Sequence, residues 1–215
     1  MRLYTYFRSS AAYRVRIALG LKQLEWEPVP IHLVLDGGQQ HSAKYTAINP
    51  AGLVPALEDD GAILTQSLAI IEYLEEKYPE SPSLLPGDAL ARAHIRALAQ
   101  SIACDLHPIN NLRILKYLEN PLAIDAEQRK AWYLHWVDVG LKAFEKQLVL
   151  YNQPGDFCYG STPTLADVCL IPQIYNAHRF GYNTEHLARV TKAMQACIQL
   201  PAFIEAEPAN QVDAE

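Results

Sequence analysis

Several features that would point to particular classes of protein are missing from this sequence. No apolar run approaches the roughly 18 residues of a membrane-spanning helix, and the start, MRLYTYFRSS, lacks the apolar stretch of a signal peptide. Basic residues are the minority, with 18 Lys and Arg against 24 Asp and Glu, which argues against nucleic-acid binding as the main activity. We therefore expect a cytoplasmic protein with no membrane segment and no nucleic-acid partner.

Cysteine is scarce as well. The four residues, Cys104, Cys158, Cys169 and Cys197, are widely scattered and form no Cys-x-x-Cys pair or cysteine–histidine spacing typical of metal sites. Such spacing favours single buried thiols in a reducing compartment over disulfides. No metal site is predicted.

The 215 residues, half of them hydrophobic, suffice for one large or two small domains. The first 78 residues predict strand, helix, strand, short helix, strand, strand and helix, an α/β layered unit. Residues 79–88, PESPSLLPGD, carry three prolines between two helical patterns and predict a linker, and almost everything beyond them predicts helix. We assign a first domain to 1–80, a linker to 81–87 and an all-helical domain to 88–215, with the polar residues after Pro208 frayed.

The most informative stretch is 54–74, VPALEDDGAILTQSLAIIEYL. Pro55 cannot donate to a strand ladder and belongs at the start of a strand, and a cis Val54–Pro55 bond would leave the N–H and C=O of Val54 free to pair with an extended peptide. Residues 59–61, Asp-Asp-Gly, predict a hairpin turn. Ser67 stands where the N-cap of an amphipathic helix is expected, and the free N–H groups there favour a carboxylate. Capping and strand breaking alone explain these residues equally well.

A pair of serines, Ser9 and Ser10, stands where a predicted strand over 2–7 meets the first predicted helix. Capping the helix is the plainer interpretation. A hydroxyl beside free N–H groups at a helix start would also lower the pKa of a nearby thiol, because both favour the anion. Arg14 and Arg16 follow one turn later and suit surface ion pairs as well as ligands.

In the helical part, the run from His107 to Arg113, HPINNLR, predicts a proline kink beside polar groups. Helical spacing would pair Asn110 with Arg113, and His107 with Asn111, on an ordinary polar surface or on a cleft wall. Arg179 ends another predicted helix, where the helix dipole stabilises a cation. Residues 164–167, Thr-Leu-Ala-Asp, predict a capping box, which assigns Asp167 to folding.

Residues 8–19, RSSAAYRVRIAL, resemble the signature of the zeta-class glutathione transferases, and 54–74 resembles the glutathione-binding half of their thioredoxin-like domain. Ala11 replaces the cysteine of the zeta pattern, which the related maleylpyruvate isomerases also lack. The likeness extends from Met1 to about Pro208. It implies a thioredoxin-like α/β domain, a following all-α domain and a homodimer.

The resemblance also implies roles for single residues. Ser9, or less favourably Ser10, would activate the glutathione thiol, although Tyr6 is an alternative hydroxyl. Arg8 and Arg179, with help from Arg113, would hold a dicarboxylate substrate, a task that suits guanidinium forks. The residues implied in glutathione binding are Ser10, Ala11, Gln40, Val54, Pro55, Gln66, Ser67, His107, Asn111 and Arg113.

The activity that the resemblance implies is glutathione-dependent cis–trans isomerisation of maleylacetoacetate to fumarylacetoacetate, in the catabolism of tyrosine or of aromatic acids. Three alternatives stay open: a maleylpyruvate isomerase, a detoxifying transferase acting on haloacids or other electrophiles, and a non-enzymatic glutathione-fold interaction module. The serine pair and the arginines favour an enzyme over a module. Maleylpyruvate isomerases carry an arginine at the place of Leu112, and its absence here favours maleylacetoacetate.

Overall fold

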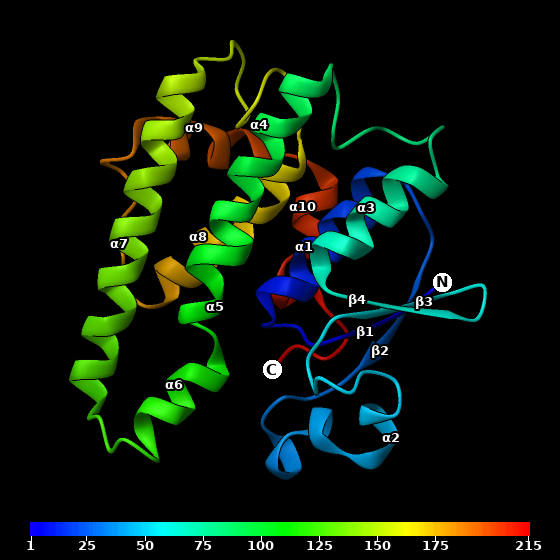
Figure 1. Cartoon of the computed structure of the whole chain (residues 1–215), viewed down its shortest axis with the longest axis vertical. Helices are drawn as coiled ribbons and strands as arrows, with labels where there is room; N and C mark the ends of the chain where they lie inside the picture. The colour runs from blue at the N-terminus through cyan, green and yellow to red at the C-terminus, as the bar shows by residue number, and fades with distance from the viewer. The chain divides into compact units, whose positions relative to one another are not determined.

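A four-stranded mixed sheet organises the first part of the chain in the computed structural model, which describes all residues from 1 to 215 (Figure 1). The strands are β1 (Arg2–Thr5), β2 (Glu27–Pro30), β3 (Ala56–Asp59) and β4 (Ala62–Thr65), in the order β2-β1-β3-β4. Strand β1 runs parallel to β2 and antiparallel to β3, and β3 and β4 form a hairpin. As expected for a strand with two prolines, β2 lies at an edge of the sheet.

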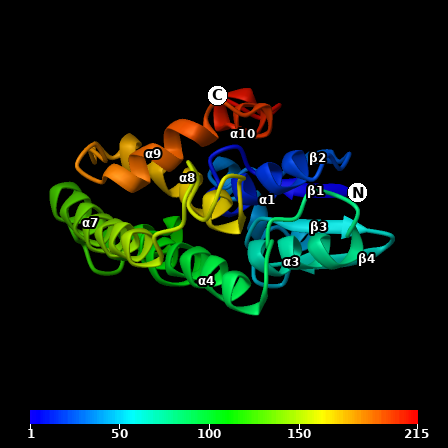
Figure 2. The same ribbon diagram turned by 90° about the horizontal axis from the view of Figure 1, so that it is seen from above.

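Helices cover both faces of this sheet. Figures 1 and 2 show α1 (Ser10–Leu21) and α3 (Ser67–Lys77) together on one face, and Figure 1 shows the short α2 (Ala43–Thr46) on the other. Side chains alternate along β1 accordingly: Leu3 is fully buried, while Tyr4 joins an aromatic and aliphatic cluster with Tyr45 of α2. Two short 3₁₀ turns, Leu35–Gly37 and Gln39–His41, lead from β2 toward α2.

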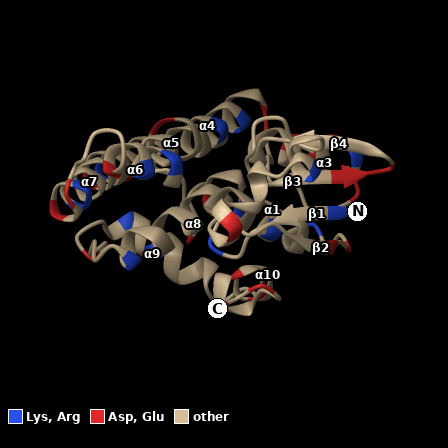
Figure 3. Ribbon diagram, turned by 90° about the horizontal axis from the view of Figure 1, so that it is seen from below, with Lys and Arg blue, Asp and Glu red and all other residues tan.

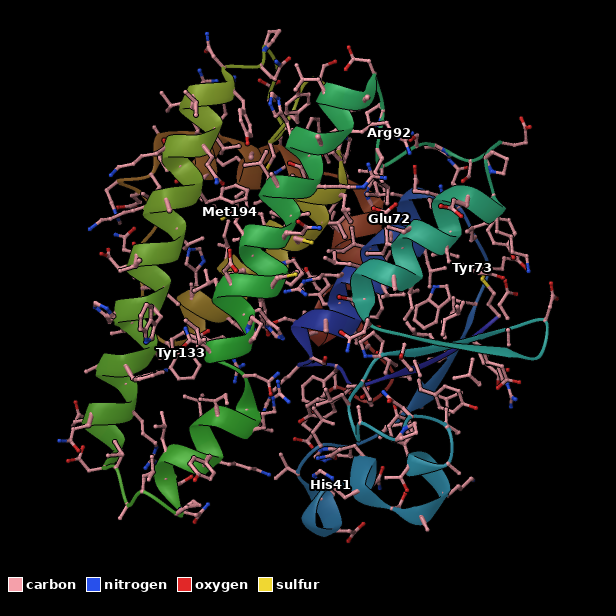
Figure 4. All side chains as sticks on the ribbon, in the orientation of Figure 1. His41, Glu72, Tyr73, Arg92, Tyr133 and Met194 are labelled. Atoms are coloured by element: carbon pink, nitrogen blue, oxygen red, sulfur yellow. The ribbon has the colours of Figure 1, made fainter.

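Charged side chains fasten the hairpin and the end of α3. Figure 3 shows acidic residues along the β3–β4 hairpin beside a basic residue of β1, and the Arg2 guanidinium donates to the Glu58 carboxylate at 2.6 Å. At the turn, the buried Oδ2 of Asp59 accepts hydrogen bonds from the Tyr73 and Tyr78 hydroxyls and from Lys77 Nζ, each at 2.9 Å. Figure 4 shows Tyr73 pointing from α3 toward the hairpin. The strand-turn-strand-helix order predicted for 54–74 is therefore confirmed.

The last residues of the chain belong with this first unit. The chain divides into Met1–Leu84 with Ile198–Glu215, and Leu85–Cys197, whereas the sequence predicted a single helical domain over 88–215. Helix α10 (Pro201–Ala206) lies on α1 so closely that a Cβ at Gly20 would come within 3.1 Å of Ala202 Cβ. Glycine in the interior of α1 is explained by this close approach.

The second unit is helical. Its elements are α4 (Ala89–Gln100), a π-helical turn (Ser101–Leu106), α5 (His107–Ile109), α6 (Leu112–Glu119), α7 (Ala126–Tyr151), α8 (Leu165–Arg179) and α9 (Ala188–Cys197). The predicted bend near Pro108 is present, since proline cannot donate the hydrogen bond of a regular helix and a π-turn precedes it. No helix in the chain has the length and apolar character needed to cross a bilayer.

All four cysteines are free thiols. Cys158, Cys169 and Cys197 are buried in the second unit as predicted, and burial raises the pKa of the Cys158 and Cys197 thiols, the adjacent Asp167 adding to the effect. The expectation of burial is wrong for Cys104, which lies exposed on the π-helical turn.

A buried ion pair fixes the end of the first unit where the linker begins. Lys22 Nζ lies 2.7 Å from Glu75 Oε1, and the same carboxylate accepts from the Leu84 N–H and the Ser83 hydroxyl. Burial acts to raise the pKa of Glu75, but these hydrogen bonds outweigh it and hold that pKa below its ordinary value. The carboxylate is therefore bound in its ionised form.

This geometry predicts an acid-sensitive contribution to stability. Because the folded pKa of Glu75 is depressed, its contribution is complete above the unfolded pKa and is lost as the pH falls through the folded value. We expect Glu75→Gln to lower the free energy of unfolding by about 2 kcal/mol at pH 7, and to remove this part of the decline toward low pH. Denaturant unfolding between pH 7 and pH 3 measures both, with exposed Glu76→Gln from the same helix as control. Equal losses in the two variants would contradict the prediction.

Candidate active site

Ser9 lies at the N-cap of α1, at the end of the loop that leaves β1. Its backbone is extended, and its Oγ accepts a hydrogen bond from the Ala12 N–H at 3.2 Å. A hydroxyl that accepts one bond still has a proton to donate, so capping does not exclude a second partner. Ser10, in contrast, is the first residue of α1 and only 4 % exposed. The half-buried Ser9 is therefore the better placed of the two to meet a ligand.

Two residues near Ser9, Arg8 and Tyr6, differ in their exposure to solvent. Arg8 is exposed, with its guanidinium carbon 4.7 Å from the centre of the Phe7 ring. Tyr6 is buried in the cluster on the α2 face, where its ring lies edge-on to Phe7 and His32. Its burial makes Tyr6 a weaker candidate than Ser9 for activating a thiol.

The backbone at Val54 offers hydrogen bonds that the fold does not use. The Val54–Pro55 peptide bond is cis, and β3 begins only at Ala56. The preceding carbonyl, of Leu53, accepts from the Tyr45 hydroxyl and the Asn49 amide, while the N–H and C=O of Val54 have no partner. An extended ligand could pair with these two groups.

The start of α3 differs by one residue from the prediction. Gln66, not Ser67, occupies the N-cap, and it does so with a positive φ of 69° and without a side-chain capping bond. A non-glycine residue held in this region costs about 1–3 kcal/mol and is typical of functional sites. Ser67 is instead the buried first residue of the helix, and its Oγ accepts from Arg14 Nη1 at 3.3 Å.

For Arg14, the sequence left open whether the side chain forms a surface ion pair or binds a ligand. It is 2 % exposed, which excludes a surface ion pair, and it brings a guanidinium to the N-terminal end of α3. A cation and a helix N-terminus both favour an anion. The signal was available in the sequence, because Arg14 and Arg16 interrupt the otherwise apolar helix from Tyr13 to Leu21.

Gln40 provides a buried amide on the second 3₁₀ turn, Gln39–His41. Its Nε2 lies 3.0 Å from His41 Nε2 and 3.5 Å from the Leu33 carbonyl, while its Oε1 is buried without a partner. A Cβ at Gly38, where φ is 104°, would come within 2.6 Å of the same amide. An unsatisfied buried oxygen is costly, and a ligand N–H would satisfy it.

The polar run from His107 to Arg113 does not form one continuous helix, because α5 ends at Ile109 and α6 begins at Leu112. Asn111 caps α6 by accepting from the Arg113 N–H, and its Nδ2 lies 3.5 Å from His107 Nε2, as the spacing predicted. The predicted pairing of Asn110 with Arg113 is wrong, because the helix breaks between them. Asn110 is turned inward and donates to the Tyr133 carbonyl at 3.2 Å.

Arg179 lies near the same tyrosine. It is the last residue of α8 and donates to Asn176 Oδ1, and the ring of the next residue, Phe180, stacks on Tyr133 with 3.7 Å between centres. Figure 4 shows Tyr133 projecting from α7 toward α8. Burial raises the pKa of Tyr133, and the charge of Arg179 partly offsets the rise. Tyr133 thus contacts both Asn110 and Phe180 at the end of α8. Nothing in the sequence predicted this role of Tyr133.

Comparison with known proteins defines the class. A family model for the N-terminal domain of glutathione S-transferases matches residues 3–82. The whole chain superimposes on a maleylpyruvate isomerase, described as a bacterial glutathione S-transferase of the zeta class, with a TM-score of 0.96, 42 % identity and 100 % coverage of both chains. The fold is thus that of a glutathione S-transferase.

Two further relatives narrow the assignment. A probable maleylacetoacetate isomerase of Vibrio cholerae is 48 % identical over 99 % of this chain and 97 % of its own. A maleylacetoacetate isomerase structure from Methylobacterium extorquens with bound malonate and glutathione has a TM-score of 0.94 and 40 % identity, with 100 % of both chains covered. The chain belongs to the maleylacetoacetate isomerase family, the zeta class of glutathione transferases.

Proposed function

We propose that this protein is a glutathione-dependent cis–trans isomerase that converts maleylacetoacetate to fumarylacetoacetate. The observation that carries the proposal is the hydroxyl of Ser9, which caps α1 and still has a proton to donate. A thiol held there would ionise more readily, because the hydroxyl and the helix N-terminus favour its anion. Such a thiolate is the nucleophile that the reaction needs.

Glutathione occupies the first unit in this proposal. Its cysteinyl backbone pairs with the N–H and C=O of Val54, beside Pro55. Its γ-glutamyl carboxylate binds at Gln66, Ser67 and the start of α3, where the buried Arg14 adds positive charge. Gln40 Oε1 accepts a hydrogen bond from a ligand N–H. Ser10 and Ala11 border the thiol as the first residues of α1.

The isomerisation requires only that the cis carbon–carbon double bond become a single bond temporarily, so that rotation about it is possible. The thiolate sulfur adds to a carbon of the conjugated cis double bond, and the π electrons move to the carbonyl oxygen to give an enolate. The former double bond, now single, rotates. The enolate electrons then re-form the double bond as the sulfur–carbon bond breaks, which releases the trans product and the thiolate. Glutathione is a cofactor here because nothing of it is consumed.

The arginines and their polar neighbours hold the substrate. Arg8, Arg113 and Arg179 pair with the two carboxylates and offset the enolate charge, a task for which planar guanidinium groups are suited. His107 and Asn111 complete the binding of glutathione and substrate. In the second unit, the Asn111 cap orients the start of α6, which carries Arg113.

Leu112 is the position that favours maleylacetoacetate over maleylpyruvate as the substrate. It is 38 % exposed and begins α6, so no guanidinium stands at this place beside Arg113. Maleylpyruvate isomerase activity is the second candidate, since the superposition on a maleylpyruvate isomerase extends over the whole chain. We also propose that the protein works in the cytoplasm and that, as the zeta-class resemblance implies, it is a homodimer. Sedimentation at micromolar concentration tests the dimer.

An ultraviolet assay of cis-to-trans conversion tests the function. Maleylacetoacetate and maleylpyruvate are supplied in parallel, each with and without glutathione. We expect turnover of maleylacetoacetate that disappears when glutathione is omitted, and weaker turnover of maleylpyruvate. Faster turnover of maleylpyruvate would reverse the assignment of substrate. Bound glutathione with no isomerisation of either compound would contradict the proposal and leave a detoxifying transferase or a non-enzymatic interaction module.

A further inference from the structure

The segment Gln211–Glu215 lies against the loop that carries Ser9. The Oδ2 of Asp213 accepts a hydrogen bond from the Phe7 N–H at 3.0 Å, two residues before Ser9, and its Oδ1 is buried. In Figure 1 the end of the chain passes beside β1 and the beginning of α1. The prediction that residues after Pro208 fray is therefore wrong for this segment, because its carboxylates find partners within the first unit.

Arg16 holds the same loop from the other side. Its buried guanidinium donates to the carbonyls of Tyr6 and Phe7 and, with two nitrogens, to the carbonyl of Ala206 at the end of α10. Burial lowers the pKa of Arg16 to about 10, and the charge of Asp213 acts against the decrease. Phe7 is thus held at both of its backbone groups, its carbonyl by Arg16 and its N–H by Asp213.

The loop between these contacts is a tight turn that ends on Ser9. The Ser9 N–H donates to the Tyr6 carbonyl at 2.9 Å, and that carbonyl also accepts from Arg16. Arg16 and Asp213 therefore hold the backbone on which Ser9 stands. A shift of the Phe7 peptide would be passed through this turn to the Ser9 side chain.

The same segment reaches the loop that leads to Gln40. Glu215 Oε1 lies 2.8 Å from His32 Nε2, while His32 Nδ1 accepts from the N–H groups of Val34 and Leu35. The backbone N–H of His32 in turn donates to Oε1 of the Gln39 side chain. The segment Gln211–Glu215 thus contacts both the loop that carries Ser9 and the loop that leads to Gln40.

We propose that Asp213 is a positioning residue for Ser9: together with Arg16 it fixes the Phe7 peptide and so sets the direction of the Ser9 hydroxyl at the start of α1. The proposal rests on the proposed function, since it assigns Ser9 the task of stabilising the glutathione thiolate. Asp213 itself touches no reacting atom. Its effect is on the ionisation of the bound thiol and on turnover.

The test compares Asp213→Ala with Asp213→Asn, which keeps an oxygen that accepts from the Phe7 N–H. The thiol pKa of bound glutathione is read from thiolate absorbance against pH, and kcat and KM for glutathione from the isomerase assay. We expect Asp213→Ala to raise the thiol pKa by about one unit and to lower kcat about tenfold, because a misplaced hydroxyl stabilises the anion less. KM should change less than kcat. Asp213→Asn should stay near the wild type.

Glu205→Ala is the matched control, since Glu205 is an exposed carboxylate on α10 whose side chain forms no hydrogen bond or ion pair. If Asp213→Ala does not fold, as judged by circular dichroism, Asp213→Ser replaces it, because the shorter side chain does not reach the Phe7 N–H. A wild-type thiol pKa and kcat in a folded Asp213→Ala or Asp213→Ser protein would overturn the proposal. The thiol titration needs no substrate, so a wild type that fails to isomerise would contradict the proposed function and leave the role of Asp213 testable.

Discussion

Replacing Ser9 with alanine is expected to reduce glutathione-dependent isomerisation at least about a hundredfold, the usual effect of removing a donor that stabilises a developing or bound anion. The loss should lie in kcat and be accompanied by a higher pKa of the bound thiol. Removing the N-cap also costs about 1 kcal/mol of stability, so folding must be confirmed by thermal unfolding. Steady-state kinetics from pH 5.5 to pH 9 measures the effect.

Two further variants separate the hydroxyl of Ser9 from its role as a cap. Ser9→Thr keeps both the cap and the donor, and should retain most of the activity. Ser10→Ala removes the buried hydroxyl one residue later and should leave the thiol pKa unchanged. If Ser10→Ala were inactive and Ser9→Ala active, the assignment of the two serines would have to be exchanged.

Replacing Asp167 with alanine should destabilise the protein by about 4 kcal/mol, because it leaves several buried donors without an acceptor. Its Oδ2 accepts from the Thr164 N–H and hydroxyl at 2.8 and 2.9 Å, and its Oδ1 accepts from the Cys158 N–H at 2.8 Å. Burial raises the pKa of this carboxyl, and the hydrogen bonds from Cys158 and Thr164 oppose the rise. Denaturant unfolding at pH 7 measures the loss.

Asp125→Ala is a suitable control for this measurement. Asp125 caps α7 by accepting a single bond from the Gln128 N–H at the surface, so its removal should cost only about 1 kcal/mol. Thiol pKa and kcat per folded molecule should be unaffected in both variants. A cost for Asp167→Ala no larger than that for Asp125→Ala would show that α8 does not depend on its buried cap.

The sequence predicted elements better than it predicted contacts. Turn residues and apolar spacing were enough for the hairpin of 54–74, for the helix after it and for the cap at Asp167, since these depend on near neighbours. The contact that Arg14 makes could not be read in the same way. It depends on α3, more than fifty residues away, where Arg14 meets Ser67.

Two errors have physical causes of the same kind. Helical spacing suggested a shared face for Asn110 and Arg113, but inward hydrogen bonding of Asn110 to Tyr133 accompanies a break in the helix. Polar composition suggested a frayed end after Pro208, but Asp213 and Glu215 find a backbone N–H and a histidine. The composition of a segment indicates how much apolar surface the segment can bury. It does not show which hydrogen-bond partners distant parts of the chain provide.

The placement of α10 on α1 has a consequence for how the chain is made. Arg16 binds the carbonyl of Ala206 across 190 positions, and Phe7 binds Asp213 across 206. A ribosome therefore releases the sheet and α1 long before it releases the residues that complete their packing, and the whole helical unit emerges in between. The helical unit is the one that can mature during synthesis, while the glutathione-fold unit becomes native only after translation of α10 and the segment beyond it.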